Sequence, residues 1–152
     1  MSQRTAARSK ARAAARLAAT QALYQHEMEG TVPTVLLHEF HQHRLGATIE
    51  DVEYADADVD FFDDVVTGVI ARAEEIDGRI AANLTAAWTL DRLDKSMKAI
   101  LRAGTYELLA RKDVPVATVI NEYLDVAHAY FDRREAGFVN GVLDGVAKGA
   151  RD

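Results

Sequence analysis

Cysteine is absent from this chain of 152 residues, and proline occurs only at Pro33 and Pro115. Without cysteine, the chain has no disulfide bond, no thiolate zinc site and no cysteine nucleophile. A cysteine-free composition suits a cytoplasmic protein, and we expect that location. Because proline interrupts helices, its scarcity favours long helical segments. No apolar run is long enough to span a membrane, so we expect no association with a membrane.

Sequence motifs for catalysis are also lacking. Serine occurs only at Ser2, Ser9 and Ser96, and the sequence has no GxSxG, P-loop or GxGxxG motif. The adjacent acids at 63–64 and 74–75 are more typical of a solvated helix surface than of a catalytic dyad. No reactive set of side chains can be assembled from these residues. We therefore expect a protein that is not an enzyme and that binds no cofactor.

Histidine is concentrated in one short stretch, HEFHQH, which holds His38, His41 and His43. On a helix, His38 and His41 can face a metal ion together. However, no third ligand follows at helical spacing, and the HExxH motif is absent. We interpret these residues as surface histidines and expect no metal site.

The spacing of apolar residues predicts an all-α fold of six or seven helices, with no convincing strand. From Phe62 to Leu84 they recur every three or four residues, which indicates one long helix. The first helix is expected to end at Gly30, and the last to begin at Phe138.

Polar segments separate the predicted helices. The acidic segment 46–60 is expected to be a loop, with Asp58 or Asp60 capping the helix that follows. Asp113 lies two residues before Pro115 and is a plausible cap for the next helix. The charged segment 132–137 is expected to be a short loop. Together these segments define one domain, residues 1–152, with helical halves at about 1–84 and 85–152.

Positive charge is concentrated at the N-terminus of an otherwise acidic chain. The net charge is −6, yet residues 1–26 hold five basic residues and no acid, which leaves 13 basic and 24 acidic residues elsewhere. Such a chain can touch a polyanion locally and offer an acidic surface to a basic protein. The first ten residues contain few apolar groups, so we expect this basic arm to be loose until it binds.

Within the arm, Arg4, Arg8, Arg12 and Arg16 recur every fourth residue and form a stripe along a helix, with Lys10 nearby. Arginine binds phosphate bidentately and stacks on unpaired bases, so the stripe indicates an RNA contact. Two alternatives remain, a frayed and solvated helix end and an organelle transit peptide.

A second basic set, Lys95, Lys98 and Arg102, shares one face of a predicted helix, while Met97 and Ile100 point towards the core. If this helix lies beside the arm, the two sets form one groove. Alone, the set is also typical of an ordinary solvated face.

Taken in order, several segments of the chain resemble the NusB family of bacterial transcription antitermination factors. The resemblance covers nearly the whole chain, and its most specific pieces are INE and FVNGVLD. It is carried by AATQALYQ (18–25), FFDDVVTGV (61–69), ID (76–77), WTL (88–90) with Leu93, ILR (100–102), YEL (106–108), VP (114–115), VINE (119–122) and FVNGVLD (138–144).

The resemblance implies an all-helical fold of two packed three-helix-type bundles and a binding function without catalysis. It implies that the chain pairs with the ribosomal protein NusE, that the pair recognises single-stranded boxA RNA in ribosomal RNA leaders, and that the complex joins RNA polymerase. The family's basic N-terminus matches Arg8, Lys10, Arg12 and Arg16, and its central helix matches Lys98 and Arg102. Phe138 opens the FVNG motif and is carried over as an RNA contact. The chain departs from the family in carrying Arg133 and Arg134, which make the preceding loop basic and favour RNA there.

Alternative functions remain open at this stage. One is a helical module that binds only proteins and leaves the arm unused. Another is an RNA-targeting domain related to that of ribosomal RNA methyltransferases, although the chain has neither the cofactor loop nor the cysteines of their catalytic domain, and we expect none after Asp152. The resemblance leaves open a monomer or a homodimer.

Overall fold

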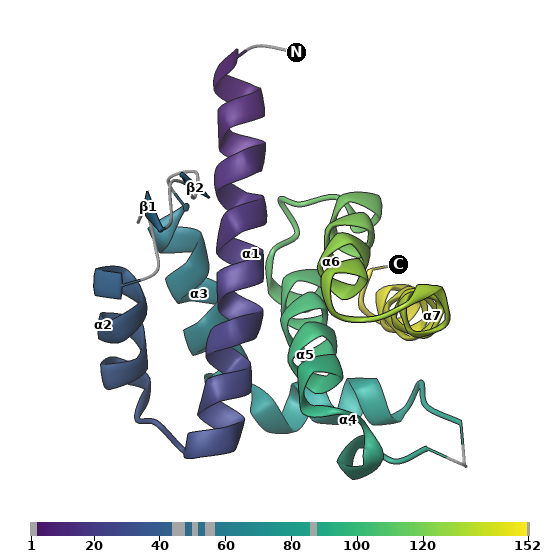
Figure 1. Ribbon diagram of the computed structural model, residues 1–152. Helices are drawn as coiled ribbons and strands as arrows, with labels where there is room; N and C mark the ends of the chain where they lie inside the picture. Colours follow the sequence, from purple (N-terminus) through teal and green to yellow (C-terminus); the bar gives the residue numbers. More distant parts are fainter. Residues whose placement is uncertain (1–2, 44–47, 50–51, 54–56, 86–87, 152) are drawn as a thin grey trace. The chain divides into compact units, whose positions relative to one another are not determined.

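The computed structural model describes residues 3–43, 48–49, 52–53, 57–85 and 88–151 (Figure 1). Helices make up most of this part of the chain, and the predicted all-α fold is confirmed. The described residues contain one 3-10 turn, η1 (Leu90–Arg92), and seven α-helices: α1 (Gln3–Glu29), α2 (Pro33–His43), α3 (Val59–Ala71), α4 (Ala73–Ala81), α5 (Lys95–Ala110), α6 (Val116–Tyr130) and α7 (Arg133–Ala150).

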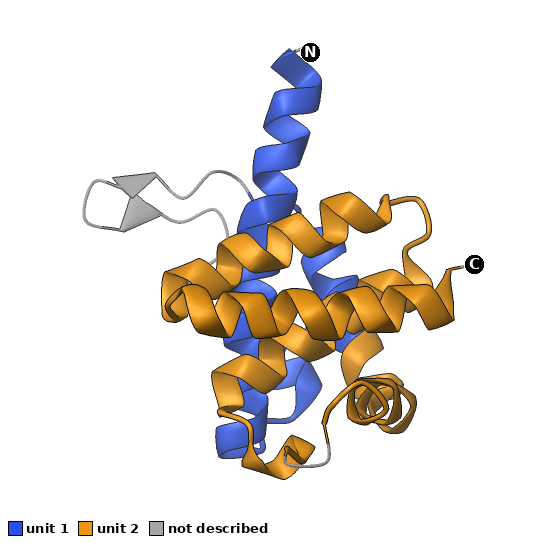
Figure 2. Ribbon diagram, turned by 90° about the vertical axis from the view of Figure 1, so that its right-hand side faces the viewer, with its two compact units in different colours: residues 1–67 blue, residues 68–152 orange. Residues whose placement is uncertain are grey.

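The chain forms two compact units, residues 1–67 and 68–152 (Figure 2). The N-terminal unit holds α1, α2 and most of α3, and the C-terminal unit holds α4 to α7. The division into halves expected near residue 84 stays a prediction. Within the described ranges, no helix combines the length and the apolar character that a membrane crossing requires.

The boundary between α1 and α2 follows the predicted signals. Gly30 has a φ of 65°, a left-handed conformation that glycine adopts without a steric penalty, and its N–H donates to the carbonyl of His26 at 2.9 Å. Pro33 is the first residue of α2, where its missing N–H is not needed. The predicted end of the first helix at Gly30 is confirmed. Residues 3–10 are helical, and their order in the absence of RNA stays a prediction.

Small and aromatic side chains make up the core of the N-terminal unit. Ala15, Ala19 and Ala22 are fully buried on α1 and let neighbouring helices approach closely. The rings of Phe40 and Phe62 stack with their centroids 5.5 Å apart, which joins α2 to α3. One side of α1, the helix that carries the basic arm, is therefore packed into this core.

The segment expected to be a loop at 46–60 holds a short ribbon, so the prediction of no strand is wrong there. Strands β1 (Thr48–Ile49) and β2 (Val52–Glu53) pair antiparallel. Residues 44–47, 50–51 and 54–56 lie outside the described residues. Asp58 accepts a hydrogen bond from the N–H of Phe61 at 3.0 Å, which confirms Asp58 as a cap of α3.

The long helix predicted from Phe62 to Leu84 is interrupted at Arg72, which separates α3 from α4. Arg72 leaves the helical conformation with φ −113° and ψ 27°, while its guanidinium binds both carboxylate oxygens of Glu75 at 3.1 and 2.8 Å. This hydrogen bonding lowers the pKa of Glu75. Because apolar residues keep their spacing across the break, periodicity alone did not reveal it.

Helix α5 is the centre of the C-terminal unit and packs against α4, α6 and α7. Asp94 caps it by accepting hydrogen bonds from the N–H groups of Ser96 and Met97 at 2.8 and 3.4 Å. Deep in this unit, the buried carboxylate of Glu107 accepts a hydrogen bond of 2.5 Å from the hydroxyl of Tyr123. A buried carboxylate is stable only with such partners, so this pair fixes α6 against α5.

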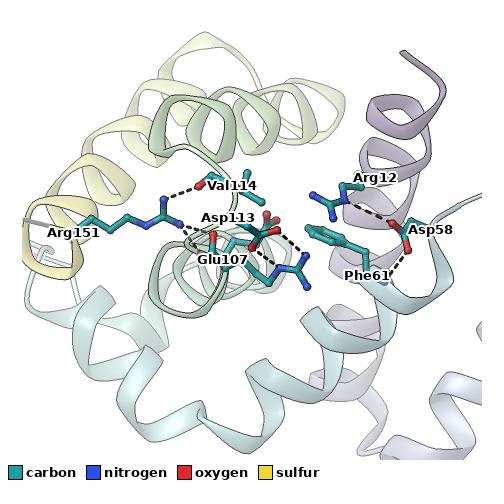
Figure 3. Close-up of polar contacts among 8 residues, drawn as sticks. Arg12, Asp58, Phe61, Glu107, Asp113, Val114 and Arg151 are labelled. Atoms are coloured by element: carbon teal, nitrogen blue, oxygen red, sulfur yellow. Dashed lines mark hydrogen bonds and ion pairs between the residues drawn. The ribbon is translucent and has the colours of Figure 1, made fainter. Parts of the chain in front are cut away.

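The turn after α5 is held by the last described residue, Arg151 (Figure 3). Its guanidinium donates to four backbone carbonyls at 2.5 to 3.0 Å, those of Glu107, Leu108, Arg111 and Val114. Asp113, predicted to cap the next helix, instead forms a bidentate pair with Arg111, and Pro115 occupies the cap position. The prediction for Asp113 is therefore wrong, because a neighbouring arginine takes its carboxylate.

We predict that Gly68→Ala lowers the free energy of unfolding by about 1–3 kcal/mol, the usual cost of overpacking. A Cβ at this position would overlap the ring of Tyr106. Gly78→Ala is the matched control, because a Cβ there meets nothing within 4 Å, and it should stabilise α4 by up to about 1 kcal/mol. Urea denaturation measures both effects. Equal effects of the two substitutions would contradict the close packing at Gly68.

We also predict that Arg151→Ala destabilises the chain by about 1.5–3 kcal/mol, since hydrogen bonds from a charged donor contribute that much. Arg151→Lys should lose nearly as much, because an ammonium group lacks the planar fork that reaches several carbonyls. Lys148→Ala is the control, as Lys148 is exposed and pairs only across one helical turn with Asp144. Thermal unfolding measures the stability of all three variants. If Arg151→Lys is as stable as the parent chain, a positive charge at this position is sufficient and the planar guanidinium is not needed.

Candidate nucleic-acid interface

The predicted arginine stripe of α1 changes character along the helix. Arg4, Arg8 and Lys10 are exposed, whereas Arg12 is half-buried and Arg16 is only 2% exposed. The first part of the stripe is therefore open to solvent, and the second part belongs to the packed body of the N-terminal unit.

An aromatic ring and a carboxylate hold the packed part of the stripe. The guanidinium carbons of Arg12 and Arg16 lie 4.7 and 4.9 Å from the centroid of the Phe61 ring. Arg12 also pairs with Asp58, Nε to Oδ2, at 3.6 Å (Figure 3). The backbone N–H of Asp58 donates to the carbonyl of Ala11 at 3.0 Å. Two cation–π contacts and an ion pair thus fix α1 at the start of α3.

This packing separates two roles that the sequence could not distinguish. Arg12 and Arg16 bind the helix to its unit, and Arg4, Arg8 and Lys10 extend from that fixed base. Arg4 and Arg8 are four residues apart, so they form a row on one face of α1 with a spacing of about 6 Å along the axis. Lys10 follows Arg8 by two residues and lies on a different face of the helix. From Gln3 onward, the arm is therefore a helical continuation of the packed part of α1.

The second basic set is not an ordinary solvated face. Lys95 is exposed in the first turn of α5, but Lys98 is only 6% exposed. Arg102 forms a bidentate pair with Asp77 on α4, at 2.8 and 3.0 Å. The solvated-face alternative is wrong for Lys98 and Arg102. Met97 and Ile100 are buried, as predicted. A single groove formed with the arm stays a prediction.

The third predicted set lies at the start of α7. Arg133 and Arg134 were expected in a loop, but they form the first turn of this helix because Asp132 caps it, accepting from the N–H of Arg134 at 3.0 Å. Hydrogen bonds from the Glu135 side chain and from this N–H lower the pKa of Asp132. Both arginines are exposed, and Phe138 is half-buried one turn later.

Phe138 lines a pocket of about 440 Å³ in the C-terminal unit. Trp88 and Arg92 form part of the same wall, and Trp88 is 50% exposed. Neither residue was predicted as part of a site. A lone tryptophan in a polar turn was the available signal, but half of the other lining residues lie more than 40 positions further along the chain. The pocket is lined by Trp88, Arg92, Leu93, Asp94, Met97, Phe131, Arg134, Glu135 and Phe138.

The histidine stretch has a structural contact. The Nε2 atom of His41 lies 2.6 Å from Oδ1 of Asp63, which joins α2 to α3. His38 is exposed. Among the residues that the structure describes, no three side chains suited to a metal ion come together.

Comparison with known proteins gives one consistent result. The NusB family model matches residues 13–148. Transcription antitermination protein NusB of Sphingopyxis alaskensis is 67% identical over 144 residues, which cover 95% of this chain and 97% of that protein. Its namesake in Novosphingobium aromaticivorans is 69% identical over 142 residues, covering 93% and 96%.

A solved structure resembles the fold over the same extent. It is a crystal structure of antitermination factors NusB and NusE in complex with dsRNA, and its matching chain is 28% identical to this one. The TM-score is 0.75, and the match covers 91% of this chain and 96% of that chain.

We predict that Arg16→Gln and Arg8→Gln differ sharply in stability. Arg16→Gln removes a buried guanidinium from the Phe61 ring and should lower the free energy of unfolding by about 1–3 kcal/mol. Arg8→Gln changes an exposed residue and should stay within about 0.5 kcal/mol of the parent chain. Urea denaturation at matched salt measures both. Equal stabilities would mean that the packing of Arg16 contributes nothing to folding.

Proposed function

Because the chain belongs to the NusB family, we propose that it is a transcription antitermination factor that binds boxA RNA of ribosomal RNA leader transcripts. It does so together with the ribosomal protein NusE, and the complex supports processive transcription by RNA polymerase. The observation that carries this proposal is the near full-length identity to proteins called transcription antitermination protein NusB. The structural relative that contains NusB, NusE and RNA supports both partners.

The distribution of exposed positive charge supports single-stranded RNA as the ligand. Arg4 and Arg8 form a row on one face of α1, and Lys10 is exposed on another face of the same helix, which is held in place by the packing of Arg12 and Arg16. In this proposal, RNA phosphates bind along that row, since arginine donates two parallel hydrogen bonds to a phosphate. Lys95, Lys98, Arg102, Arg133 and Arg134 remain further candidate contacts.

Phe138 and the pocket beside it suit an unpaired base. Sequence-specific recognition of RNA uses bases that are splayed out and stacked on aromatic or guanidinium planes. The pocket offers Trp88 and Phe138 next to the exposed cation of Arg134. A single strand can present bases there, whereas a continuous duplex keeps them stacked. We therefore favour a single strand as the recognised form, although the structural relative holds dsRNA.

The acidic body is proposed to meet NusE. Beyond residue 26 the chain carries 13 basic and 24 acidic residues, a net charge of −11. Such a surface attracts a basic partner and would repel RNA if it acted alone. When basic NusE covers part of the acidic surface, this repulsion of RNA is reduced. RNA should therefore bind more tightly to the pair of proteins than to this chain alone. In this proposal the chain acts in the cytoplasm by binding, without catalysis. A homodimer is an alternative state, in which NusE would have to displace the second copy of the chain.

A module that binds only proteins is the second candidate function. It is favoured by exposed apolar side chains in the N-terminal unit, Tyr24, Met28, Val32 and Val35, which are 40 to 60% exposed. In that case the arm takes no part in binding, and removal of its charges changes no affinity for the partner.

Binding of a boxA RNA at several salt concentrations, with and without NusE, tests the proposal. We predict tighter binding with NusE. The double substitution Arg4→Gln/Arg8→Gln removes two phosphate contacts and should flatten the slope of log affinity against log salt by about 1.4, at roughly 0.7 for each contact.

The matched control is Lys112→Gln/Lys148→Gln, which removes two exposed charges from the C-terminal unit. It should leave the slope unchanged. If the arm variant binds boxA RNA with the parent slope and affinity, the arm has no role in RNA binding. If NusE binds and RNA does not, the protein-only function is correct.

A further inference from the structure

A carboxylate of α4 holds one member of the second basic set. The Nε and Nη2 atoms of Arg102 donate to Oδ1 and Oδ2 of Asp77 at 2.8 and 3.0 Å. Both side chains are partly open to solvent, with 21% of Arg102 and 30% of Asp77 exposed. The pair is therefore at the surface of the C-terminal unit, where a ligand in solution can reach it.

The carboxylate of Asp77 binds an edge of the guanidinium that a phosphate would also use. Arginine binds carboxylates and phosphates with the same geometry, through two parallel N–H···O hydrogen bonds. In this chain Asp77 accepts that pair of bonds from Nε and Nη2 of Arg102. A phosphate that binds the same edge must displace Asp77, so the two anions compete.

This competition favours Asp77 over a phosphate of the RNA. Asp77 and Arg102 belong to the same compact unit, and their helices, α4 and α5, pack against each other. The carboxylate is thus held next to the guanidinium at a high effective concentration. A phosphate must come from solution and loses freedom when it binds. The charge of Asp77 also offsets that of Arg102, which weakens its attraction for a second anion.

The position of Arg102 on α5 makes this competition relevant to RNA. Lys95 is exposed in the first turn of α5, and Arg102 lies seven residues later, about two turns along the same face. If Arg102 were released, the positive charge of this face would extend over those two turns. A single strand that passes Lys95 would then meet a second cation.

We propose that Asp77 limits the RNA affinity of this chain by withholding Arg102 from the phosphate backbone. The inference rests on the proposed RNA-binding function and identifies an acidic residue that sets its strength. Phosphate contacts carry no sequence information, so Asp77 affects the affinity and its salt dependence without changing which bases are recognised. A chain without this carboxylate should gain one phosphate contact.

The substitution Asp77→Asn tests the inference, because asparagine keeps the shape of the side chain and removes its charge. Binding of boxA RNA is measured with NusE at several salt concentrations. We expect binding to become about three- to fivefold tighter at low salt, as for a charge pair that is partly open to solvent. The slope of log affinity against log salt should steepen by about 0.7, the value for one phosphate contact on a single strand.

Asp113→Asn is the matched control for the loss of one negative charge. Asp113 also forms a bidentate pair, with Arg111 at 3.1 and 3.0 Å, in the turn at the other end of α5. Arg111 belongs to none of the predicted RNA-binding sets. This control should change the affinity by less than about twofold and keep the parent slope. Equal gains from the two substitutions would show that net charge alone acts, and would overturn the inference.

An NMR measurement reports on the guanidinium itself and needs no substitution of Asp77. The side-chain Nε–H signal of Arg102 is followed in the ¹⁵N-labelled chain with NusE, and its absence in Arg102→Lys identifies it. In the parent chain, boxA RNA should leave this signal in place, whereas in Asp77→Asn it should shift the signal. A signal that shifts in the parent chain would mean that Asp77 does not withhold Arg102.

Failure of the inference can be distinguished from failure of the proposed function. If the parent chain binds boxA RNA with NusE but Asp77→Asn binds no more tightly, only the role of Asp77 is wrong. If the parent chain binds no boxA RNA with or without NusE, the proposed function fails, and the role of Asp77 fails with it.

Discussion

The packing of two guanidinium groups against the ring of Phe61 determines what the N-terminus of this protein can do. Arg12 and Arg16 both lie within 5 Å of that ring centroid, and Asp58 pairs with Arg12 while capping α3. These contacts turn a basic tail into the fixed base of a helix. Arg4 and Arg8 extend from this base and are exposed along one face of the helix.

The C-terminal unit is stabilised by polar contacts of a different kind. Around α5, Arg102 pairs with Asp77, Glu107 accepts from Tyr123, and Arg151 satisfies four carbonyls at the end of the helix. Each contact joins elements that are distant in sequence. They join α5 to α4 and α6, and join the turn after α5 to the end of α7. The aromatic pocket is lined by residues at the starts of α5 and α7.

The sequence predicted the parts of the structure that depend on local pattern. Gly30 ends α1, Asp58 caps α3, and the periodic segment around Ile100 is buried. It did not predict features that depend on a distant partner. The stripe of arginines looked uniform in the sequence, yet Arg16 is buried against the ring of Phe61. Arg102 was a candidate for an ordinary solvated face, yet it pairs with Asp77 on another helix. The pocket was missed for the same reason, since Trp88 and Glu135 line it together although they lie far apart in sequence. Assignment of individual RNA contacts stays a prediction for every basic residue considered.

Hydrogen exchange of the backbone amides, measured with and without boxA RNA in the presence of NusE, tests most directly whether RNA occupies both the arm and the pocket. Binding should slow exchange at residues 3–10 of α1 and in the first turn of α7, because these helix ends are the proposed contacts and open most readily on their own. Slower exchange in both regions is the predicted result. Unchanged exchange in both regions, with protection confined to other surfaces, would contradict the proposed RNA site.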